Sequence, residues 1–327
     1  MSQAEDLSTT SSSSVAIASE SHSTDLTKHP TSEVSSEPLL LYKNFWFRRQ
    51  FVDRIKLLQV RFKARHDDII IATNPKCGTT WLKALAFTIT NRSRYDFSNH
   101  PLLTRHPQEL VKTIDVEIPL NGDLTSIETL PSPRILATHM PFSLLPESIG
   151  SHGCRILYIC RDPKDAFVSR WHFTNEVFTE KVDINVAFNK CCEGISDFGP
   201  FWDHCLEYWK ESTGKPDRVF FLKYEDMMLE PVKFVKTLAS FLGGPFSHEE
   251  KDAGVVEEVV RLCSFKTLSS LNNSETDVVQ RGYLAVKKSA YFRRGNVGDW
   301  VNHISDEMGR KLDYIVEEKL KGSGLVF

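Results

Sequence analysis

The sequence predicts a single α/β domain, with a central, mostly parallel sheet flanked by helices and a P-loop-like anion-binding loop. The first observation is the run Ile69–Ile71, whose β-branched apolar residues are typical of a strand buried on both faces. The second is the helical spacing of apolar residues in 81–89, which indicates an amphipathic helix directly after that strand. A hydrophobic content of 41% in 327 residues is enough for one large core.

Residues 1–37 form a segment rich in Ser, Thr, Glu and Asp, which cannot bury enough apolar surface to become ordered. A transit peptide is the alternative, because such peptides are Ser-rich, but they are also Arg-rich and poor in acidic residues. This segment holds six acidic residues and no arginine. We therefore expect a disordered cytosolic tail at 1–37 and one folded domain at 38–327.

Composition narrows the class of partner. A net charge of −3 gives no global basic field for nucleic acid. No run of eighteen apolar residues is present, so no membrane span is expected. Seven cysteines without a Cys-x-x-Cys motif fit reduced thiols in a cytoplasmic protein. Composition therefore indicates neither nucleic acid nor a membrane as partner.

The loop between the first strand and its helix has the residues of a phosphate cradle. Asn74-Pro75 ends the strand, because proline donates no ladder hydrogen bond and restricts the residue before it. Gly78 allows a positive φ or a close approach of ligand to backbone. Backbone N–H groups, the helix dipole and Lys76 therefore converge on one anion. An ordinary turn with a surface lysine is the alternative interpretation.

The remaining elements follow in order. An aromatic cluster, Phe45-Trp46-Phe47, fits a pocket wall and a cap on the core equally well. The irregular stretches 92–133 and 272–290 are expected to be loops with short helices and a mobile loop, of the kind that often binds substrates. Strands are expected at 134–139, 154–160 and 218–222, and helices at 48–64, from Pro163 onward, and at 183–194, 200–213, 231–242, 249–262 and 306–321.

Two candidate residues follow the predicted strands. His139 ends the strand at 134–139, and Arg161 follows the strand at 154–160, just before Asp162 as N-cap and Pro163 at the first helical position. Open α/β sheets bind ligands at the carboxyl ends of their strands. A lone histidine at a strand end is more often structural, but the phosphate cradle at the same edge favours a catalytic role.

Several segments together resemble one family. Pro-Lys-x-Gly-Thr-Thr-Trp, ending at Trp81, resembles the phosphosulfate-binding loop of cytosolic sulfotransferases. The segment from Arg161 to Ser169 resembles the part that binds the nucleotide 3′-phosphate in that family. Thr138-His139 and Arg293-Arg294-Gly295 follow in the family's order, although two arginines before a glycine would in isolation fit a solvated basic turn. The chain is thus similar to a plant-type soluble sulfotransferase.

The resemblance implies 3′-phosphoadenosine 5′-phosphosulfate (PAPS) as sulfuryl donor and a hydroxyl group of a small molecule as acceptor. Flavonoids, hydroxyjasmonates, brassinosteroids and desulfoglucosinolates are all acceptors within the family. The implied roles are His139 as catalytic base; Lys76, Cys77, Gly78, Thr79 and Thr80 at the 5′-phosphosulfate; Arg161, Ser169, Arg293, Arg294 and Gly295 at the 3′-phosphate; and Trp81, Tyr224 and Phe265 at the adenine.

These residue types suit the chemistry of sulfuryl transfer. A neutral imidazole can take the proton of the attacking hydroxyl near pH 7. The compact ammonium of Lys76 matches charge that builds on the leaving oxygen, whereas arginines suit a static phosphate. The reaction requires no metal, and the sequence contains no evident metal-ligand cluster.

Three departures from the family pattern stand out. Cys77 replaces a serine, and its place beside Lys76 at a helix N-terminus predicts a moderately stabilised thiolate; a thiol that merely fills a serine-sized space is the alternative. Ala137 stands where many animal members have a lysine. The dimer signature of animal members is not visible after Trp300, so the oligomeric state is left open.

Two rival functions are an ATP-dependent small-molecule kinase and a non-catalytic nucleotide-binding protein. The kinase would need a lysine after the glycine of the loop and an acidic magnesium ligand. The loop has its lysine before the glycine. His139 argues against the non-catalytic alternative.

Overall fold

The computed structural model describes residues 27–28, 38–272, 276–282 and 284–327. Its centre is a five-stranded sheet in the order β5-β6-β4-β7-β8, in which all neighbours are parallel. The predicted α/β class is confirmed, and all four predicted strands are present. The strand bounds are β4 Ile69–Thr73, β5 Lys112–Thr113, β6 Ile135–Thr138, β7 Arg155–Cys160 and β8 Val219–Lys223.

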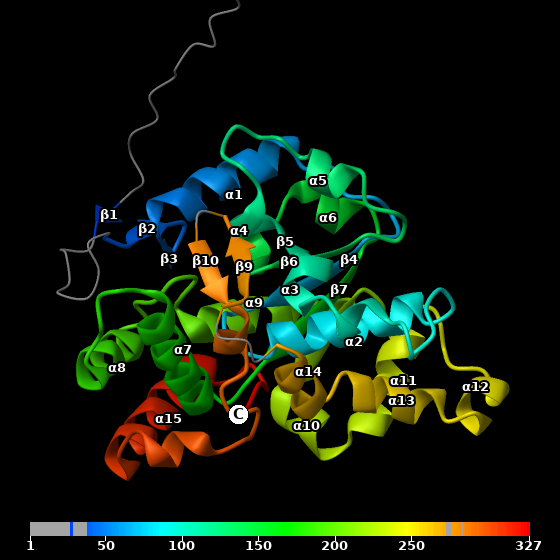
Figure 1. Cartoon of the computed structure of the whole chain (residues 1–327). Coiled ribbons are helices and arrows are strands. Elements are labelled where there is room, and N and C mark those ends of the chain that lie inside the picture. Colours follow the sequence, from blue (N-terminus) through cyan, green and yellow to red (C-terminus); the bar gives the residue numbers. More distant parts are fainter. Residues whose placement is uncertain (1–26, 29–37, 273–275, 283) are drawn as a thin grey trace, which may run out of the picture.

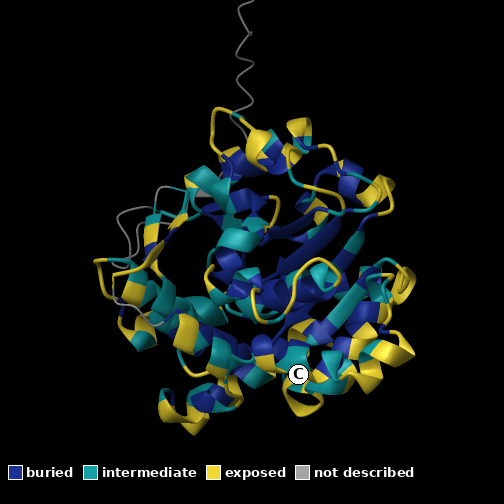
Figure 2. Cartoon of the chain, turned by 45° about the vertical axis from the view of Figure 1, so that its right-hand side comes forward, coloured by how far each residue is buried: buried dark blue, intermediate teal, exposed yellow. Residues whose placement is uncertain are grey.

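The central strand β4 is buried on both faces, and its residues alternate between two cores. Ile69 and Ile71 pack in one core, whereas Ile70 and Ala72 pack in the other. Figure 1 shows α2, α11 and α13 together on one side and α7, α8 and α15 on the other. In Figure 2 the strands form a buried centre and exposed residues lie at the periphery. The unbroken apolar run that predicted this strand thus has helices on both faces.

The longer helices agree with most of the predicted ranges. One core contains α2 (Thr79–Asn91), α11 (Pro231–Phe241) and α13 (Val255–Leu262). The other contains α1 (Arg49–Arg61), α7 (Pro163–Val177), α8 (Ile184–Cys192), α9 (Phe201–Gly214) and α15 (Asp306–Leu320). The predicted helix at 249–262 is in fact two, α12 (His248–Asp252) and α13, because Gly254 adopts a positive φ of 72° between them.

Two irregular stretches contain strands that the sequence analysis missed. The stretch 92–133 holds β5, and the predicted loop at 272–290 holds an antiparallel hairpin, β9 (Val278–Arg281) and β10 (Leu284–Lys287). The short helices are α3 Pro107–Leu110, α4 Ile114–Glu117, α5 Thr125–Glu128, α6 Glu147–Ser151, α10 Tyr224–Leu229 and α14 Phe265–Leu271, with 3-10 turns at Pro101–Leu103, Phe142–Leu144, Lys288–Tyr291 and Asp299–Asn302.

The N-terminal part of the domain is a small antiparallel sheet of β1 (Thr27–Lys28), β2 (Leu40–Tyr42) and β3 (Phe45–Phe47). Residues 27–28 of the predicted disordered tail form β1 and pair with β2, which differs from the prediction; the rest of 1–37 lies outside the described residues. Phe45 and Phe47 are buried in the core, so this cluster caps the core. Within the described ranges, no helix combines the length and apolarity needed to cross a bilayer.

The register of the parallel sheet aligns the ends of its strands. Ala72 of β4 pairs with Thr138 of β6, and Thr73 pairs with Ile159 of β7. Cys160 of β7 pairs with Lys223 of β8. The residues that follow these four strands therefore emerge at one edge of the sheet, which is where open α/β folds bind ligands.

Candidate functional site

A cavity of about 410 Å³ lies at this edge of the sheet. Its walls include Lys76 after β4, His139 after β6, Arg161 after β7 and Tyr224 after β8. Every residue that the sequence predicted for the site lines this cavity except Cys77. Side chains that are distant in the sequence are thus gathered around one pocket.

The loop at 74–78 presents its main chain to the cavity. Lys76 and Gly78 have positive φ values of 72° and 110°. A Cβ atom at Gly78 would lie 2.9 Å from Cδ2 of Tyr224 and 3.0 Å from Cδ1 of Ile159, so no side chain fits there. Gly78 also offers no side-chain cap to α2. The first N–H groups of α2, which begins with Thr79 and Thr80, are therefore available to an anion.

The ammonium group of Lys76 lies against aromatic rings in the cavity. Its Nζ is 4.0 Å from the ring centre of Phe173 and 5.8 Å from that of Tyr291. Burial, followed by repulsion from Arg161 and Arg293, lowers the pKa of Lys76 to about 7. An anion bound at the loop would therefore find both a cation and an excess of positive charge around it.

The imidazole of His139 is held in one orientation. Its Nδ1 lies 2.9 Å from the main-chain carbonyl oxygen of Thr73, which can only accept, so Nδ1 carries the proton. Asp115 accepts the main-chain N–H of His139 at 3.0 Å, and His204 donates from Nε2 to the His139 carbonyl at 3.0 Å. Burial lowers the pKa of His139 well below its usual value. The ring is therefore neutral at pH 7, with an unprotonated Nε2.

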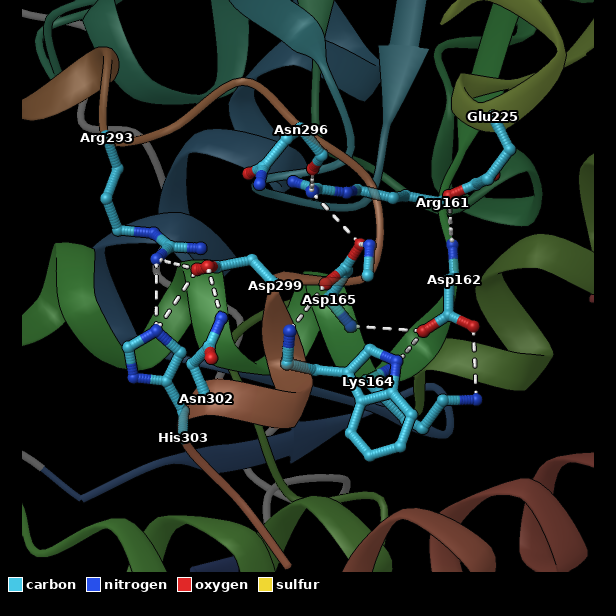
Figure 3. Close-up of polar contacts among 12 residues, drawn as sticks. Arg161, Asp162, Lys164, Asp165, Glu225, Arg293, Asn296, Asp299, Asn302 and His303 are labelled. Atoms are coloured by element: carbon cyan, nitrogen blue, oxygen red, sulfur yellow. Dashed lines mark hydrogen bonds and ion pairs between the residues drawn. The ribbon is translucent and has the colours of Figure 1, made fainter. Parts of the chain in front are cut away.

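Arg161 is tied to the segment 293–300 by Asp165, a fully buried residue of α7 (Figure 3). Asp165 accepts the main-chain N–H groups of Gly298 at 2.7 Å and Trp300 at 3.0 Å. It also accepts from Nη2 of Arg161 at 3.3 Å, and the same Nη2 donates to the carbonyl oxygen of Asn296 at 2.7 Å. One carboxylate thus fixes both predicted phosphate-binding segments relative to each other.

Arg293 has its own supporting carboxylate. Its Nη1 donates to Asp299, which also accepts from Asn302 and His303 (Figure 3). Burial would raise the pKa of Asp299, but the hydrogen bonds from Arg293 and Asn302 outweigh it and lower that pKa to about 2. The Nε atoms of Arg161 and Arg293 are buried and have no partner in the described part of the chain. Such N–H groups are suited to a phosphate oxygen.

Three aromatic side chains, Trp81, Tyr224 and Phe265, line one end of the cavity. Trp81 and Tyr224 meet edge to face with ring centres 5.5 Å apart, and the guanidinium of Arg161 lies over the Tyr224 ring at 4.6 Å. A Cβ atom at Gly295 would lie 2.2 Å from Cδ2 of Phe265. Glycine is required at 295 because the phosphate segment runs against this ring.

Cys77 is the exception among the predicted site residues. Its side chain is fully buried, and it does not line the cavity. Burial raises the pKa of its thiol to about 12, and the nearby positive charge of Arg161 does not offset this. The predicted stabilised thiolate was therefore wrong: desolvation outweighs the helix terminus and the neighbouring cation. The alternative, a thiol that fills a serine-sized space, agrees with the structure.

One wall of the cavity beside His139 was not predicted. The ring of Phe198 lies 5.5 Å from the imidazole of His139. Phe198 has a positive φ of 64°, which is rare for a bulky residue. Its N–H donates to the carbonyl oxygen of Trp46 at 2.7 Å, and its own carbonyl accepts from Nδ2 of Asn74 at 3.1 Å. Asn74 belongs to the phosphate loop, so this wall and that loop are directly bonded.

Sequence reasoning also missed residues that support the site. For Arg161, pairing with Asp162 or Asp165 was the alternative interpretation, and the pair with Asp165 is present; its bonds to the 293–300 segment were not predicted. Asp115 and Arg281 were not predicted either, because they lie in the two stretches that showed no clear periodicity. Within the described ranges, no group of three or more His, Cys, Asp or Glu residues is arranged to hold a metal ion.

Comparison with known proteins gives consistent matches. The family model described as "Sulfotransferase domain" matches residues 66–324. Cytosolic sulfotransferase 17 of Arabidopsis thaliana is 44% identical over 297 residues, which cover 89% of this chain and 85% of that protein. A flavonol sulfotransferase-like protein of Flaveria bidentis is 41% identical over 288 residues, covering 87% and 92%.

Solved structures agree with these matches. The crystal structure of a sulphotransferase from Arabidopsis thaliana superposes with a TM-score of 0.71 at 36% identity and covers 92% of both chains. Mouse sulfotransferase SULT7A1, crystallised with PAP, gives a TM-score of 0.69 at 25% identity, covering 87% of this chain and 95% of that one. PAP is adenosine 3′,5′-bisphosphate, the desulfated form of PAPS.

Proposed function

Because the chain belongs to the sulfotransferase family, it is a PAPS-dependent sulfotransferase, and we propose that His139 and Lys76 carry the transfer to a hydroxyl group of a small plant metabolite. PAPS supplies the sulfuryl group, and the bond between sulfur and the 5′-phosphate oxygen breaks during transfer. The observation that carries the proposal is that Lys76, His139 and the predicted phosphate ligands line one cavity.

The residues of the cavity fit such a nucleotide. The buried, unpartnered Nε atoms of Arg161 and Arg293 suit the 3′-phosphate, with Ser169, Arg294 and Gly295 beside them on the cavity wall. Gly78, Thr79 and Thr80 suit the 5′-phosphosulfate, since α2 begins there without a side-chain cap. Trp81, Tyr224 and Phe265 offer flat apolar faces to the adenine.

His139 is suited to act as general base. Its unprotonated Nε2 is available because Thr73 fixes the proton on Nδ1. The depressed pKa keeps the ring neutral in the resting protein, so it can accept the proton of an attacking hydroxyl. When that proton arrives, the Thr73 carbonyl still accepts from Nδ1.

Lys76 is suited to meet charge that develops on the leaving oxygen. In the absence of an anion its pKa is about 7, and a bound phosphosulfate would raise this pKa and favour the ammonium form. Its aromatic neighbours Phe173 and Tyr291 hold the side chain in the cavity. A positioned cation of this kind lowers the barrier chiefly in the transition state.

The acceptor class and location follow the relatives. Proteins named cytosolic sulfotransferases and a flavonol sulfotransferase-like protein are among the matches, which supports a cytoplasmic enzyme that acts on a hydroxylated metabolite. Residues 38–327 would form the catalytic domain, with 1–37 preceding it as a tail.

The test is transfer of labelled sulfate from PAPS to a panel of hydroxylated metabolites, in buffer with a chelator. We expect a sulfated product without added metal, and retention of the protein on immobilised PAP but not on ATP. Retention on PAP without transfer to any acceptor would support the non-catalytic alternative. Magnesium-dependent phosphate transfer from ATP would support the kinase instead.

A further inference from the structure

The cavity contains a second group of cations besides those assigned to the nucleotide. Four arginines line it besides the residues assigned to the nucleotide: Arg48, Arg54, Arg170 and Arg281. They come from the start of α1, from α7 and from β9. Asp197 is the only acidic side chain among the described residues of the cavity wall. The cavity wall is therefore rich in positive charge even before the nucleotide-binding cations are counted.

A chain of contacts links one of these arginines, Arg281, to the base. Asp115 accepts a hydrogen bond from the main-chain N–H of His139. Glu117, two residues later, accepts one from Nη1 of Arg281 at 3.3 Å. The same Nη1 donates to Thr113 Oγ1 at 2.9 Å. Arg281 is also the first charged group that lowers the pKa of His139 after burial. Arg281 thus lies within electrostatic reach of the proposed base.

Arg170 and Arg48 both contact the Ser196–Asp197 segment, which directly precedes Phe198. Arg170 donates to the main-chain carbonyl of Asp197 at 2.5 Å and to Oγ of Ser196 at 3.3 Å, both uncharged partners. Arg48 pairs with the Asp197 carboxylate at 3.2 Å and lies over the ring of Phe178. The Asp197 carboxylate thus pairs with Arg48, while Arg170 is bonded to uncharged oxygens.

The rest of the acceptor side is apolar. Its walls are formed largely by Phe51, Phe173, Phe178, Phe198, Val116 and Leu284. An apolar pocket with a few placed polar groups selects a ligand with an apolar body and a matching polar group. Here the placed groups are cationic, and arginine forks match the two oxygens of a carboxylate.

We propose that the acceptor is an anionic molecule, a hydroxylated carboxylic acid with an apolar body, whose carboxylate binds on the arginine-rich side while its hydroxyl group faces His139. This inference rests on the proposed sulfuryl transfer. It also explains an electrostatic need: a negatively charged acceptor must approach a highly charged donor, and Arg281 and Arg170 offset the repulsion between the two anions. A neutral acceptor would leave the described residues of this wall with one carboxylate, Asp197, against four arginines.

The experiment compares matched acceptors that differ only in charge. Hydroxyjasmonate and ferulate are each assayed against their methyl esters with labelled PAPS, and kcat/KM is measured for all four. We expect the acid of at least one pair to be sulfated with a kcat/KM about tenfold or more above that of its ester, as loss of a charge-assisted hydrogen bond implies. In Arg281→Gln this acid-to-ester ratio should fall about tenfold, toward equal use of acid and ester.

Arg261→Gln is the matched control, because Arg261 is exposed on α13 and, among described residues, its side chain pairs with the half-buried Glu258 alone. This variant should keep the wild-type ratio. If Arg281→Gln does not fold, calorimetric binding of acid and ester to the wild-type protein saturated with PAP gives the same comparison, and the acid should bind more tightly.

Three results would overturn the inference. The first is an ester sulfated as well as its acid, or better, in both pairs. The second is an equal loss for acid and ester in Arg281→Gln, which would assign Arg281 to the transferred group. The third is transfer confined to neutral members of a wider panel. These differ from failure of the proposed function, in which no acceptor of any charge is sulfated.

Discussion

The Nδ1 atom of His139 lies 2.9 Å from the main-chain carbonyl oxygen of Thr73, the residue that ends the central strand. Two neighbouring strand ends are thereby joined through the proposed base itself. The bond also selects the tautomer with the proton on Nδ1. Nε2 is therefore unprotonated and can act as the base, although no carboxylate is bonded to the ring among the described residues. Orientation by a backbone group ties the base to the rigid centre of the sheet.

Replacement of this base should separate chemistry from binding. In His139→Ala we expect turnover to fall by roughly 10²–10⁴-fold, while PAP affinity stays close to wild type because His139 holds no phosphate. Steady-state rates and calorimetry measure the two quantities. His152→Ala, at an exposed histidine, is the control and should behave as wild type. Near-normal turnover of His139→Ala at saturating substrates would refute the assignment.

Replacement of Lys76 and replacement of Arg161 should affect different kinetic constants. Lys76→Ala should lower kcat more than donor affinity, since the ammonium meets charge that develops in the transition state. Arg161→Ala should raise the KM for PAPS more than it lowers kcat, because its phosphate is already charged in the ground state. Kinetics of both variants decide the matter. An unchanged kcat together with weaker PAPS binding in Lys76→Ala would contradict the role proposed for Lys76.

The pKa of Lys76 near 7 predicts proton uptake on nucleotide binding. The free protein has lost most of this proton by pH 8, whereas a bound anion raises the pKa and restores it. PAP affinity should therefore weaken by up to about tenfold per pH unit above pH 7. Calorimetry in two buffers of different ionisation enthalpy counts the protons, and Lys76→Met should abolish the uptake. Release of protons at pH 8 would contradict this.

The lowered pKa of Lys76 also makes the stability of the folded protein depend on pH. The unfolded chain binds a proton at Lys76 up to its ordinary pKa of 10.5, while the folded chain releases it near pH 7. Between these values the unfolded state binds more protons, so this residue's contribution to stability should improve as pH rises. The cost of burying the ammonium is fully present only below about pH 7.

Cys77 should be slow to react. Its thiol is buried and its pKa is raised to about 12, so little thiolate exists at neutral pH. Alkylation followed by mass spectrometry should label Cys77 far more slowly in the native protein than in urea, and Cys77→Ser should keep activity. Rapid native labelling that PAP prevents would restore the thiolate hypothesis.

Asp165 should act through Arg161 and the 293–300 segment. In Asp165→Asn the charge that holds Arg161 and two main-chain N–H groups is lost. We expect the preference for PAP over adenosine 5′-phosphate to drop by about tenfold or more, as one charge-assisted hydrogen bond is worth. Competition binding measures this preference. An equal loss for both nucleotides would indicate a general folding defect.

Much of the fold and site could be predicted because the relevant signals are local. The run Ile69–Ile71 is apolar without interruption because both faces of β4 are covered, and the loop after it needs glycine for steric reasons. Strand ends place His139 and Arg161 at one edge once the sheet is parallel. These arguments need only residues that are close in sequence and the rule that parallel α/β sheets bind ligands at the carboxyl ends of their strands.

The missed parts depend on contacts distant in sequence. The short β5 and the β9–β10 hairpin are too brief to show a period, so Asp115 and Arg281 carried no signal. The Cys77 prediction failed because the sequence displays the neighbouring cation and helix start but not the depth of burial. A side chain one residue away from Lys76 in the chain faces the core instead of the cavity.

The bond between Asn74 and Phe198 has an evolutionary consequence. Phe198 is held at a φ of 64° by main-chain and amide partners, a conformation that costs about 1–3 kcal/mol without such support. Replacement of Asn74 would remove a bond that supports this backbone, so a change in the donor loop would also disturb the wall beside His139. New acceptor preferences in a lineage would then arise more readily on walls that have no direct bond to the donor loop, such as Val116 or Leu284, where a single substitution reshapes the pocket and leaves the sulfate donor's place intact.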